Sequence, residues 1–246
     1  MMRYIAPVRM LAQYIPMAAS NYMGKNVKEF TKELMVVIPK YIQAALDHPE
    51  NGRVFADIIG SELLPEEEKT MYRLSGEGFG LLAAGTETTA ATLTVITYYL
   101  LAQPTAYSRL LAALKGVDPL NLKWTDLEQR PYLYAVIHEA LRFTPGATHR
   151  SSRIARDEDL VYTSKDGQVR WVIPRGTPIG MTSVINHSNE EIFPDPDEYT
   201  PERWIKEGQP NYALEKSIIS FGKGSRSCIG MQYVKPLPFI VLASKI

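Results

Sequence analysis

The spacing of hydrophobic residues predicts that the first hundred residues are mainly helical. Apolar side chains recur every three or four positions over residues 26–46, which is typical of an amphipathic helix with one buried face. Pro65 and the three glutamates after it have the pattern of a helix start, because proline fits the first helical position and acidic groups complement the positive end of the helix dipole. We expect this second helix to run to Gln103, just before Pro104.

The helical pattern continues to about residue 145. Helix-favouring residues cover 106–115 and end at Gly116. Thr125 and Glu128 then have the spacing of a capping box, which predicts a helix start before Pro131. From that proline to about residue 145, hydrophobic residues again follow the helical period, so we expect one more amphipathic helix.

Beyond residue 150 the pattern becomes extended and then irregular. Short apolar runs at 160–162 and 169–172 flank Asp166-Gly167 and predict a β-hairpin. A second extended run is expected over 178–184, and the stretch 186–212, rich in Pro, Asp, Glu and Asn, predicts a packed coil. The expected fold class is therefore mainly α, in an α+β layout with a small β-hairpin element and a long coil.

Composition narrows the classes of function. Among 246 residues, 45% are hydrophobic and 27 basic residues balance 27 acidic ones, so a large core is expected and attraction to nucleic acid is not. The first 24 residues show neither a signal peptide nor a spanning helix. The apolar run 81–102 contains Glu87 and several threonines, which predicts a buried helix with a polar task rather than a membrane span. We therefore expect a soluble or peripheral chain without an anchor.

The most informative stretch is the glycine-rich segment 221–230 around Cys228, the single cysteine of the chain. A lone cysteine is most often a small buried hydrophobe, and this is the ordinary alternative. The three glycines of the segment permit tight turns, and a helix beginning just after Cys228 would direct its positive end at a thiolate. Arg226 adds a planar donor group suited to a carboxylate.

This segment resembles the haem-binding signature of the cytochrome P450 family, Phe-x-x-Gly-x-Arg-x-Cys-x-Gly, at every fixed position. The resemblance implies a P450 fold with haem b as cofactor and Cys228 as the thiolate ligand of the haem iron. It also implies that Arg226 binds a haem propionate, that Phe221 packs beside the thiolate and that Gly230 belongs to the cofactor site. An electron-rich thiolate ligand favours cleavage of the O–O bond.

A second motif lies within the long predicted helix, at residues 84–89. A glycine followed by an acid and hydroxyls loosens the helical ladder where a small ligand could approach, although an ordinary threonine-rich helix is the alternative. The motif resembles the oxygen-activation sequence of the P450 family, (Ala/Gly)-Gly-x-(Asp/Glu)-Thr-(Thr/Ser). The resemblance implies that Gly85 leaves space above the haem, that Thr88 hydrogen-bonds the reacting oxygen and that Glu87 helps to relay protons.

A third motif combines charged residues that are distant in sequence. Glu139 and Arg142 lie three residues apart on one predicted helix, where a surface ion pair would be the ordinary interpretation. Pro201-Glu202-Arg203-Trp204 resembles the Pro-Glu-Arg-Phe motif of the same family, with Trp in place of Phe. The resemblance implies a buried structural triad of Glu139, Arg142 and Arg203 that holds the coil leading to the cysteine.

Arg153 resembles the second propionate-binding arginine of the family, with Arg150 and Arg156 as competing candidates. His149 lies close by in sequence and could touch the other propionate or line the pocket. No constellation of His138 or His187 with the cysteine is evident, which leaves a cysteine–histidine hydrolase as a remote alternative.

The order of these motifs predicts a partial P450 domain over residues 1–246. Residues 60–230 carry the family motifs, whereas 231–246 predict an atypical C-terminus, because two prolines prevent the family's long helix after Gly230 from continuing beyond about two turns. The family's N-terminal anchor and much of its larger sheet are expected to be absent.

The function that the resemblance implies is a haem-dependent monooxygenase. It would insert one oxygen atom from O2 into a small hydrophobic organic substrate and receive electrons from an NADPH-dependent reductase. Full-length relatives are expected at the endoplasmic reticulum membrane. The alternatives are a truncated, non-catalytic remnant with weak or no haem binding, and a haem-thiolate isomerase or dehydratase that inserts no oxygen.

Overall fold

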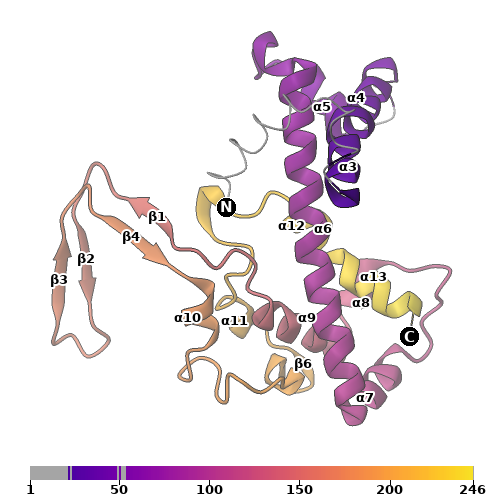
Figure 1. Cartoon of the computed structure of the whole chain (residues 1–246). Coiled ribbons are helices and arrows are strands. Elements are labelled where there is room, and N and C mark those ends of the chain that lie inside the picture. Colours follow the sequence, from indigo (N-terminus) through magenta and orange to yellow (C-terminus); the bar gives the residue numbers. More distant parts are fainter. Residues whose placement is uncertain (1–21, 23, 49, 51–53, 246) are drawn as a thin grey trace. The chain divides into compact units, whose positions relative to one another are not determined.

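The computed structural model describes residues 22, 24–48, 50 and 54–245, and the contacts within the chain divide it into two compact units, Met1–Thr86 and Glu87–Ile246. The division falls inside one long helix, α6 (Met71–Ala102), so that its first half belongs to the first unit and its second half to the second (Figure 1). The assignment of residues 1–246 to one partial domain remains a prediction.

The first unit is a small helical cluster. Its described elements are, in order, α3 (Lys25–Lys32), the π-helix η1 (Glu33–Val37), α4 (Ile38–Asp47), α5 (Val54–Gly60), the 3-10 helix η3 (Glu66–Lys69) and the first half of α6. Because α3, η1 and α4 follow one another without a break, the predicted helix over 26–46 is confirmed. Ile38, Ile42 and Leu74 form the core of this unit.

The long helix α6 begins six residues later than the sequence pattern predicts. Pro65 is extended and precedes the short 3-10 helix η3, and Thr70 is extended as well. The Thr70 carbonyl accepts the Leu74 N–H (2.9 Å) and its hydroxyl accepts the Arg73 N–H (3.4 Å), as at a helix N-cap. The predicted end of the helix at Pro104 is confirmed, since α7 (Pro104–Leu114) starts there.

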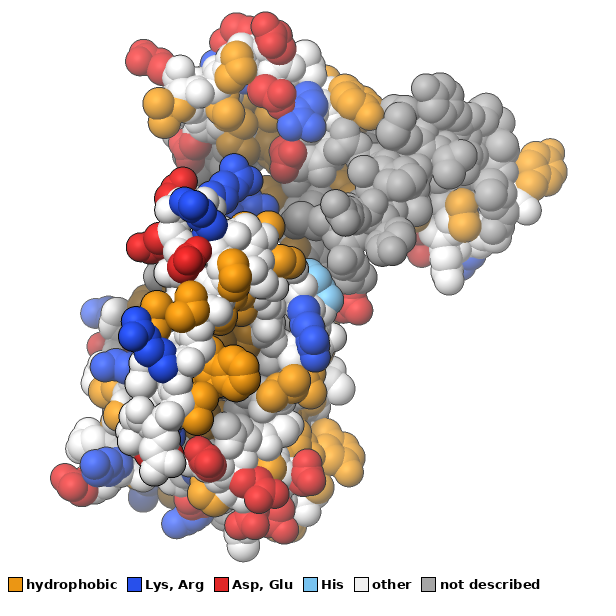
Figure 2. Space-filling model, turned by 90° about the vertical axis from the view of Figure 1, so that its left-hand side faces the viewer, with side chains coloured by type: hydrophobic (Ala, Val, Ile, Leu, Met, Phe, Trp, Pro, Cys, Tyr) orange, Lys and Arg blue, Asp and Glu red, His pale blue; other side chains and the backbone are white. Residues whose placement is uncertain are grey.

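The prediction that α6 is a buried helix is wrong for this chain. By length and composition alone α6 could cross a membrane, with a mean hydropathy of 1.2 over its most apolar window, and only 11% of that window is buried. Burial is confined to one face, which in the second unit runs through Thr92, Ile96 and Leu100, whereas Tyr98 and Leu101 are exposed. Figure 2 shows hydrophobic side chains open to solvent among charged and polar ones.

The core of the second unit is built around α9 (Pro131–Phe143). Residues 132–142 of this helix are all buried, and they pack with α7 and α8 (Trp124–Glu128) and with Trp204 and Phe193 from the coil. This confirms the helix predicted after Pro131. The capping box is wrong, because the N-cap of α8 is Lys123 and Thr125 lies inside the helix.

Four short strands form two separate antiparallel pairs. Strand β1 (Ser151–Ile154) pairs with β4 (Pro178–Met181), and β2 (Leu160–Thr163) pairs with β3 (Arg170–Ile173). The second pair is the hairpin predicted around Asp166-Gly167, and it extends away from the helices of its unit (Figure 1). The extended run expected over 178–184 ends at Met181, because α10 (Ser183–His187) begins two residues later.

The coil between α10 and the cysteine is closely packed, as predicted. It contains the 3-10 helix η4 (Pro201–Trp204), the two-residue strands β5 (Ile205–Lys206) and β6 (Gln209–Pro210), and α11 (Tyr212–Glu215). Phe193, Tyr199 and Trp204 from this coil are buried in the main core. Tyr199 donates its hydroxyl to the Val136 carbonyl of α9 (2.8 Å) and stacks on Tyr99, which ties the coil to two helices.

The helix after Gly230 ends within two turns, as its prolines predict, but a second helix follows it. The short helix α12 (Met231–Val234) is followed, after Lys235, by α13 (Pro236–Lys245), so a helix of ten residues does form. Both prolines lie in the first turn of α13, where a missing N–H leaves no helical hydrogen bond unmade. Phe239 and Leu242 of α13 are buried in the core of the second unit.

Glu215 of α11 lies in a half-buried polar cluster and is expected to make stability depend on acid. The carboxylate lies 3.5 Å from the His138 Nε2, accepts the Lys235 ammonium (3.0 Å) and accepts the Tyr134 hydroxyl (2.8 Å). These contacts, above all the one with His138, lower the pKa of Glu215 to about 2. A lowered pKa stabilises the folded state above the ordinary value, and this contribution disappears as pH falls from about 4.5 to about 2.

We expect the free energy of unfolding to fall over that pH interval. The loss of the Glu215 contribution should account for about 1 to 2 kcal/mol of this fall, a value kept small because the side chain is partly exposed to solvent. In Glu215→Gln the fall should be smaller by that amount, measured by urea unfolding at several pH values. The exposed Glu190→Gln is the control and should keep the wild-type profile. Equal profiles for wild type and Glu215→Gln would contradict the assignment.

Candidate functional site

The cysteine loop is held in a closed shape by its own backbone. The Cys228 N–H donates to the Phe221 carbonyl (2.7 Å), and the Gly222 N–H donates to the Ile219 carbonyl (2.9 Å). Within the loop, the 3-10 helix η5 (Gly224–Arg226) is closed by the bond from the Ser227 N–H to the Gly224 carbonyl. These bonds join the two ends of the loop and fix the position from which the Cys228 side chain extends.

The glycines of the loop are required by its backbone. Gly222 and Gly224 have φ angles of 66° and 76°, in the left-handed region where a side chain is strained. At Gly230 a Cβ atom would lie 3.8 Å from the Cys228 sulfur, so this glycine borders the thiol directly. The turns anticipated from the glycine spacing are therefore present in the loop.

Cys228 is a free, solvent-exposed cysteine, not a buried hydrophobe. Arg226 is also exposed, and Phe221 is half-buried against the main core. The helix that follows the cysteine, α12, begins at Met231, as expected, but it has only four residues. The ordinary interpretation of a lone cysteine as core packing is thus wrong.

The donor set of the described residues fits a haem iron better than a metal ion held by several side chains. No group of three or more His, Cys, Asp or Glu residues that could hold a metal ion occurs in the described part of the chain. A haem would need one protein side chain as a ligand of its iron, such as a thiolate. An exposed thiol on a fixed glycine loop meets that requirement.

The predicted oxygen-activation motif lies in the middle of α6, on its exposed side. Glu87 and Thr88 are exposed and belong to the same unit as the cysteine loop, whereas Gly85 belongs to the first unit. A Cβ atom at Gly85 would meet nothing within 4 Å, so the helix flank is open there. The Thr89 hydroxyl oxygen is buried without a hydrogen-bond partner among the described residues.

The turn that carries Thr88 is connected to the end of α9 by a hydroxyl pair. The Thr92 hydroxyl donates to the Thr88 carbonyl (3.1 Å) and lies 3.0 Å from the Thr144 hydroxyl. Thr144 in turn donates to the Ala140 carbonyl (2.7 Å). Each hydroxyl has one proton, so two of these three contacts are hydrogen bonds at any one time. The contact between the two hydroxyls is the one that links α6 to the end of α9 near the predicted site.

Glu139 is the centre of a buried ionic network that confirms the predicted grouping of Glu139, Arg142 and Arg203. Glu139 is fully buried, and its two oxygens accept two bonds from Arg142 (2.8 and 3.0 Å) and one from Arg203 (3.2 Å). The Thr200 N–H (2.9 Å) and the Trp204 indole N–H (2.8 Å) complete the set. This saturation of the carboxylate is what makes burial of the charge tolerable.

The two arginines of the network also hold the coil by its carbonyl groups. Arg142 donates to the carbonyls of His187, Pro196 and Glu198 (3.1, 2.6 and 3.1 Å). Arg203 donates to the carbonyl of Pro194 (2.6 Å), among others. The network therefore fixes a coil that has little regular backbone pairing of its own.

The candidate propionate residues after α9 lie on the surface. Arg153 is exposed on β1, where its backbone is opposite Ile179 of β4, and Arg150, His149 and Arg156 are exposed as well. Their roles toward haem remain predictions.

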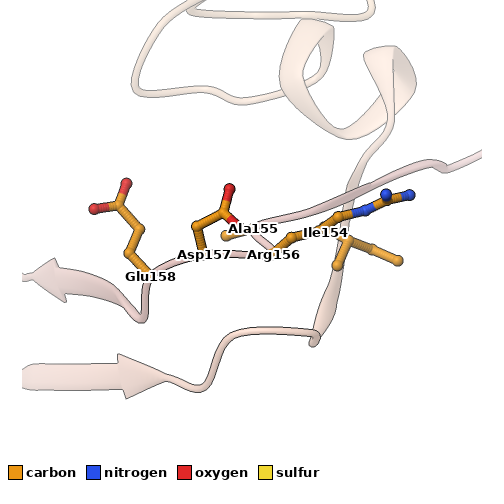
Figure 3. A pocket seen from close by; sticks show the side chains of 5 residues that line it. All are labelled: Ile154, Ala155, Arg156, Asp157 and Glu158. Carbon is orange, nitrogen blue, oxygen red and sulfur yellow. The ribbon is translucent and has the colours of Figure 1, made fainter.

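A shallow depression of about 510 Å³ lies in the turn after β1, lined by residues 154–158. Figure 3 shows the Arg156 side chain extending away from the carboxylates of Asp157 and Glu158. The lining is consecutive in sequence and charged, so this depression does not have the character of a site for a hydrophobic substrate.

Two contributors to the site were missed by the sequence analysis. Trp204 was treated as an aromatic replacement, but its indole N–H binds Glu139, which a phenylalanine could not do. His187 was assigned no partner, yet its ring bonds to Arg142 and to Ile219, just before the cysteine loop. The Trp in place of Phe was a signal that could have been used, whereas nothing in the spacing of His187 indicated its contacts.

Comparison with curated proteins identifies relatives among fungal monooxygenases. The chain is 38% identical over 203 residues to the cytochrome P450 monooxygenase ucsK of Acremonium sp., covering 80% of this chain and 38% of the relative. It is 40% identical over 206 residues to the N-acetyltryptophan 6-hydroxylase ivoC of Emericella nidulans, covering 81% and 39%. With the cytochrome P450 monooxygenase ppzE of Metarhizium majus the identity is 36%, covering 93% and 52%. The chain thus spans about two fifths to one half of the length of these relatives.

A comparison with solved structures and one with family profiles agree with the comparison to these relatives. A crystal structure of a cytochrome P450 matches 89% of this chain and 50% of its own, with a TM-score of 0.64 at 22% sequence identity, which shows the P450 fold. Haem b is the cofactor of this family. The sequence profile described as Cytochrome P450 matches residues 2–244, nearly the whole chain. The chain therefore belongs to the cytochrome P450 family.

Proposed function

We propose that this protein is a haem-dependent monooxygenase that inserts one oxygen atom from O2 into a small hydrophobic organic substrate. The observation that carries the proposal is the cysteine loop, in which a closed backbone presents an exposed, unpaired thiol at Cys228. The names of the relatives support oxygen insertion, since one of them is a hydroxylase and the others are monooxygenases.

In this proposal Cys228 binds the haem iron, and a thiolate-bound haem supplies the activation of O2. Gly230 borders the sulfur, and the Phe221 carbonyl binds the Cys228 N–H. Arg226 and Arg153 are exposed guanidinium groups able to neutralise the two propionates.

The hydroxyl-bearing turn of α6 supplies the proton chemistry. Glu87 is exposed to solvent and can exchange protons with it, and the neighbouring Thr88 hydroxyl donates a hydrogen bond toward the reacting oxygen. Gly85 adds no side chain to the open flank of the helix. In this proposal the electron donor is an NADPH-dependent reductase, and full-length relatives act at the endoplasmic reticulum membrane.

One observation favours a second candidate, a non-catalytic remnant with weak haem binding. In this chain Glu87 and Thr88 lie on a largely exposed helix, so the described residues do not enclose a water-excluding pocket around them. Oxygen activation in a solvated site loses the electrostatic advantage of a dry cavity. A haem-thiolate isomerase or dehydratase is less favoured, because the acid–hydroxyl pair needed for proton delivery is present.

The 246-residue chain incubated with hemin, reduced and exposed to carbon monoxide tests both candidates. We expect a thiolate-type carbon monoxide spectrum and, with an NADPH-dependent reductase, NADPH consumption. In Thr88→Ala more of the consumed NADPH should yield hydrogen peroxide, with Thr94→Ala on the exposed side of α6 as the control. A haem that never shows the thiolate-type spectrum would refute the monooxygenase proposal for this chain and support the remnant.

A further inference from the structure

His187 of α10 is a buried histidine whose two ring nitrogens are both engaged. The residue is 2% exposed. Its Nε2 lies 3.0 Å from the Ile219 nitrogen, which can only donate, so Nε2 accepts this bond. Its Nδ1 lies 3.1 Å from the Arg142 carbonyl, which can only accept, so Nδ1 carries the proton. The partners therefore select one neutral tautomer of the ring.

On one side, the ring is attached to the Glu139 network. The Arg142 guanidinium donates to the His187 carbonyl (3.1 Å), while the His187 ring donates to the Arg142 carbonyl. The two residues are 45 positions apart and bind each other reciprocally, through side chain and backbone in both directions. Arg142 and His187 are thus held together by two hydrogen bonds.

On the other side, the ring holds the chain just before the cysteine loop. Ile219, whose N–H is bound by His187, accepts through its carbonyl the Gly222 N–H (2.9 Å) that forms the first turn of the loop. Two residues after Ile219, the Phe221 carbonyl accepts the Cys228 N–H (2.7 Å). Hydrogen bonds, joined by the covalent backbone of residues 219–222, therefore connect Arg142, through His187 and Ile219, with Cys228.

Two neighbouring bonds anchor the same segment but serve its other residues. The Asn186 side chain donates to the Ser217 carbonyl (2.5 Å), and the Ser220 hydroxyl donates to the Leu141 carbonyl (2.7 Å). Neither bond reaches Ile219. His187 is thus the side chain that binds Ile219, the residue whose carbonyl starts the first turn of the loop.

We propose that His187 is a positioning residue for the cysteine loop, which in its neutral form fixes Ile219 and thereby the backbone that presents Cys228. The purpose assigned to that loop, iron binding through Cys228, rests on the proposed function. The positioning itself is a property of the chain without cofactor and can be measured separately.

The positioning of Ile219 requires a neutral ring, because a protonated Nε2 would place a second N–H donor against the Ile219 N–H. The pKa of His187 is lowered, mainly because the ring is buried. The bond to the Arg142 carbonyl raises this pKa and the charge of the Arg142 guanidinium lowers it, but burial is the largest effect. Among the described residues, Arg142 of α9 is the charged group that affects the pKa of the ring. Phe193 of the coil contacts the ring edge to face. The ring is therefore neutral at pH 7, and acidification should release Ile219 as the ring takes up a proton.

Two amide substitutions separate the roles of the ring nitrogens. In His187→Gln the side-chain oxygen can reach the position of Nε2 and still accept from Ile219. In His187→Asn the shorter side chain reaches only the position of Nδ1 and leaves the Ile219 N–H without an acceptor. The exposed His48→Asn, far from the loop in sequence, is the matched control.

The first measurement is hydrogen exchange of single amides in the chain without haem. We expect Ile219 and Cys228 to exchange at least tenfold faster in His187→Asn than in wild type, and within threefold of wild type in His187→Gln and His48→Asn. Exchange of Ile137, in the buried part of α9, should be unchanged in all variants and shows that they fold. Equal protection of Ile219 in the Asn and Gln variants would overturn the proposal.

The second measurement is the carbon monoxide spectrum with hemin over a range of pH. His187→Asn should lose most of the thiolate-type signal at pH 7, and His187→Gln should keep it to lower pH than wild type, because its amide takes up no proton. Identical pH profiles of wild type and His187→Gln would contradict the role of the neutral ring. If wild type gives no thiolate-type signal, the monooxygenase proposal fails for this chain, and the exchange measurement alone decides the positioning role.

Discussion

Replacing Glu139 by glutamine is expected to lower the free energy of unfolding of the second unit by about 3 to 5 kcal/mol, because it leaves buried positive charge without its partner. The glutamine side chain keeps the volume of the carboxylate but removes its charge. Arg142 is 4% exposed and would lose both charge-assisted bonds to the carboxylate, and its remaining partners are neutral carbonyls. At least two of the five donors that meet at Glu139 would also face the NH2 group of the amide, because one carboxylate oxygen accepts three of them and the other accepts two.

Urea unfolding followed by tryptophan fluorescence measures this effect in the appropriate unit. All three tryptophans of the chain, Trp124, Trp171 and Trp204, lie in the second unit. The control is Glu191→Gln, whose carboxylate is exposed and 3.6 Å from Lys165, and its change should stay within about 1 kcal/mol. A cost below about 1 kcal/mol for Glu139→Gln would show that the network contributes little to stability.

Trp204→Phe provides an intermediate case. It removes the indole N–H that binds Glu139 and part of a fully buried ring but keeps the charge pairs of the network, so we expect a smaller loss than for Glu139→Gln.

Replacing Cys228 by serine is expected to abolish the thiolate-type carbon monoxide spectrum while leaving folding almost unchanged. Serine is close to cysteine in size and keeps the backbone N–H that binds the Phe221 carbonyl, so the loop should keep its shape. Because the cysteine is exposed, the change in the free energy of unfolding should stay within about 0.5 kcal/mol. The hydroxyl offers no thiolate to an iron, so the spectral signature should be lost completely.

The measurement is the spectrum of the hemin-loaded, reduced chain under carbon monoxide, together with its urea unfolding curve. Ser227→Ala is the matched control, since Ser227 is the exposed preceding residue and the hydrogen bond described for it uses its backbone N–H. A thiolate-type spectrum in Cys228→Ser would refute the assignment of Cys228 as the iron ligand. Loss of the spectrum in both variants would instead indicate damage to the loop.

The helices and the hairpin could be predicted because each depends on neighbours within a few residues. The period of apolar residues sufficed for the helix over 26–46 and for α9, and Asp166-Gly167 sufficed for the β2–β3 hairpin. The predictions failed where the same local sequence pattern is compatible with two structures. The glutamates after Pro65 form a separate 3-10 helix, and the two prolines that end the helix after Gly230 also occupy the first turn of a second helix, α13.

The burial of α6 could not be predicted from its composition. An apolar helix becomes buried only if other elements cover each of its faces, and in this chain only the face through Thr92, Ile96 and Leu100 is covered in the second unit. Glu87 and Thr88 are accordingly exposed, although their motif was identified correctly as part of one continuous helix.

The sequence by itself determined the family, the cysteine loop and the grouping of Glu139 with two arginines, because these are carried by residue types at fixed spacings. Only the tertiary structure decided how the buried charges are satisfied. Arg142 binds the carbonyl of a residue 45 positions away, and Glu139 accepts the indole N–H of one 65 positions away. Such bonds depend on how the coil, which has little regular backbone hydrogen bonding, packs against α9. The position of the coil is selected by the need to give every buried polar group a hydrogen-bond partner.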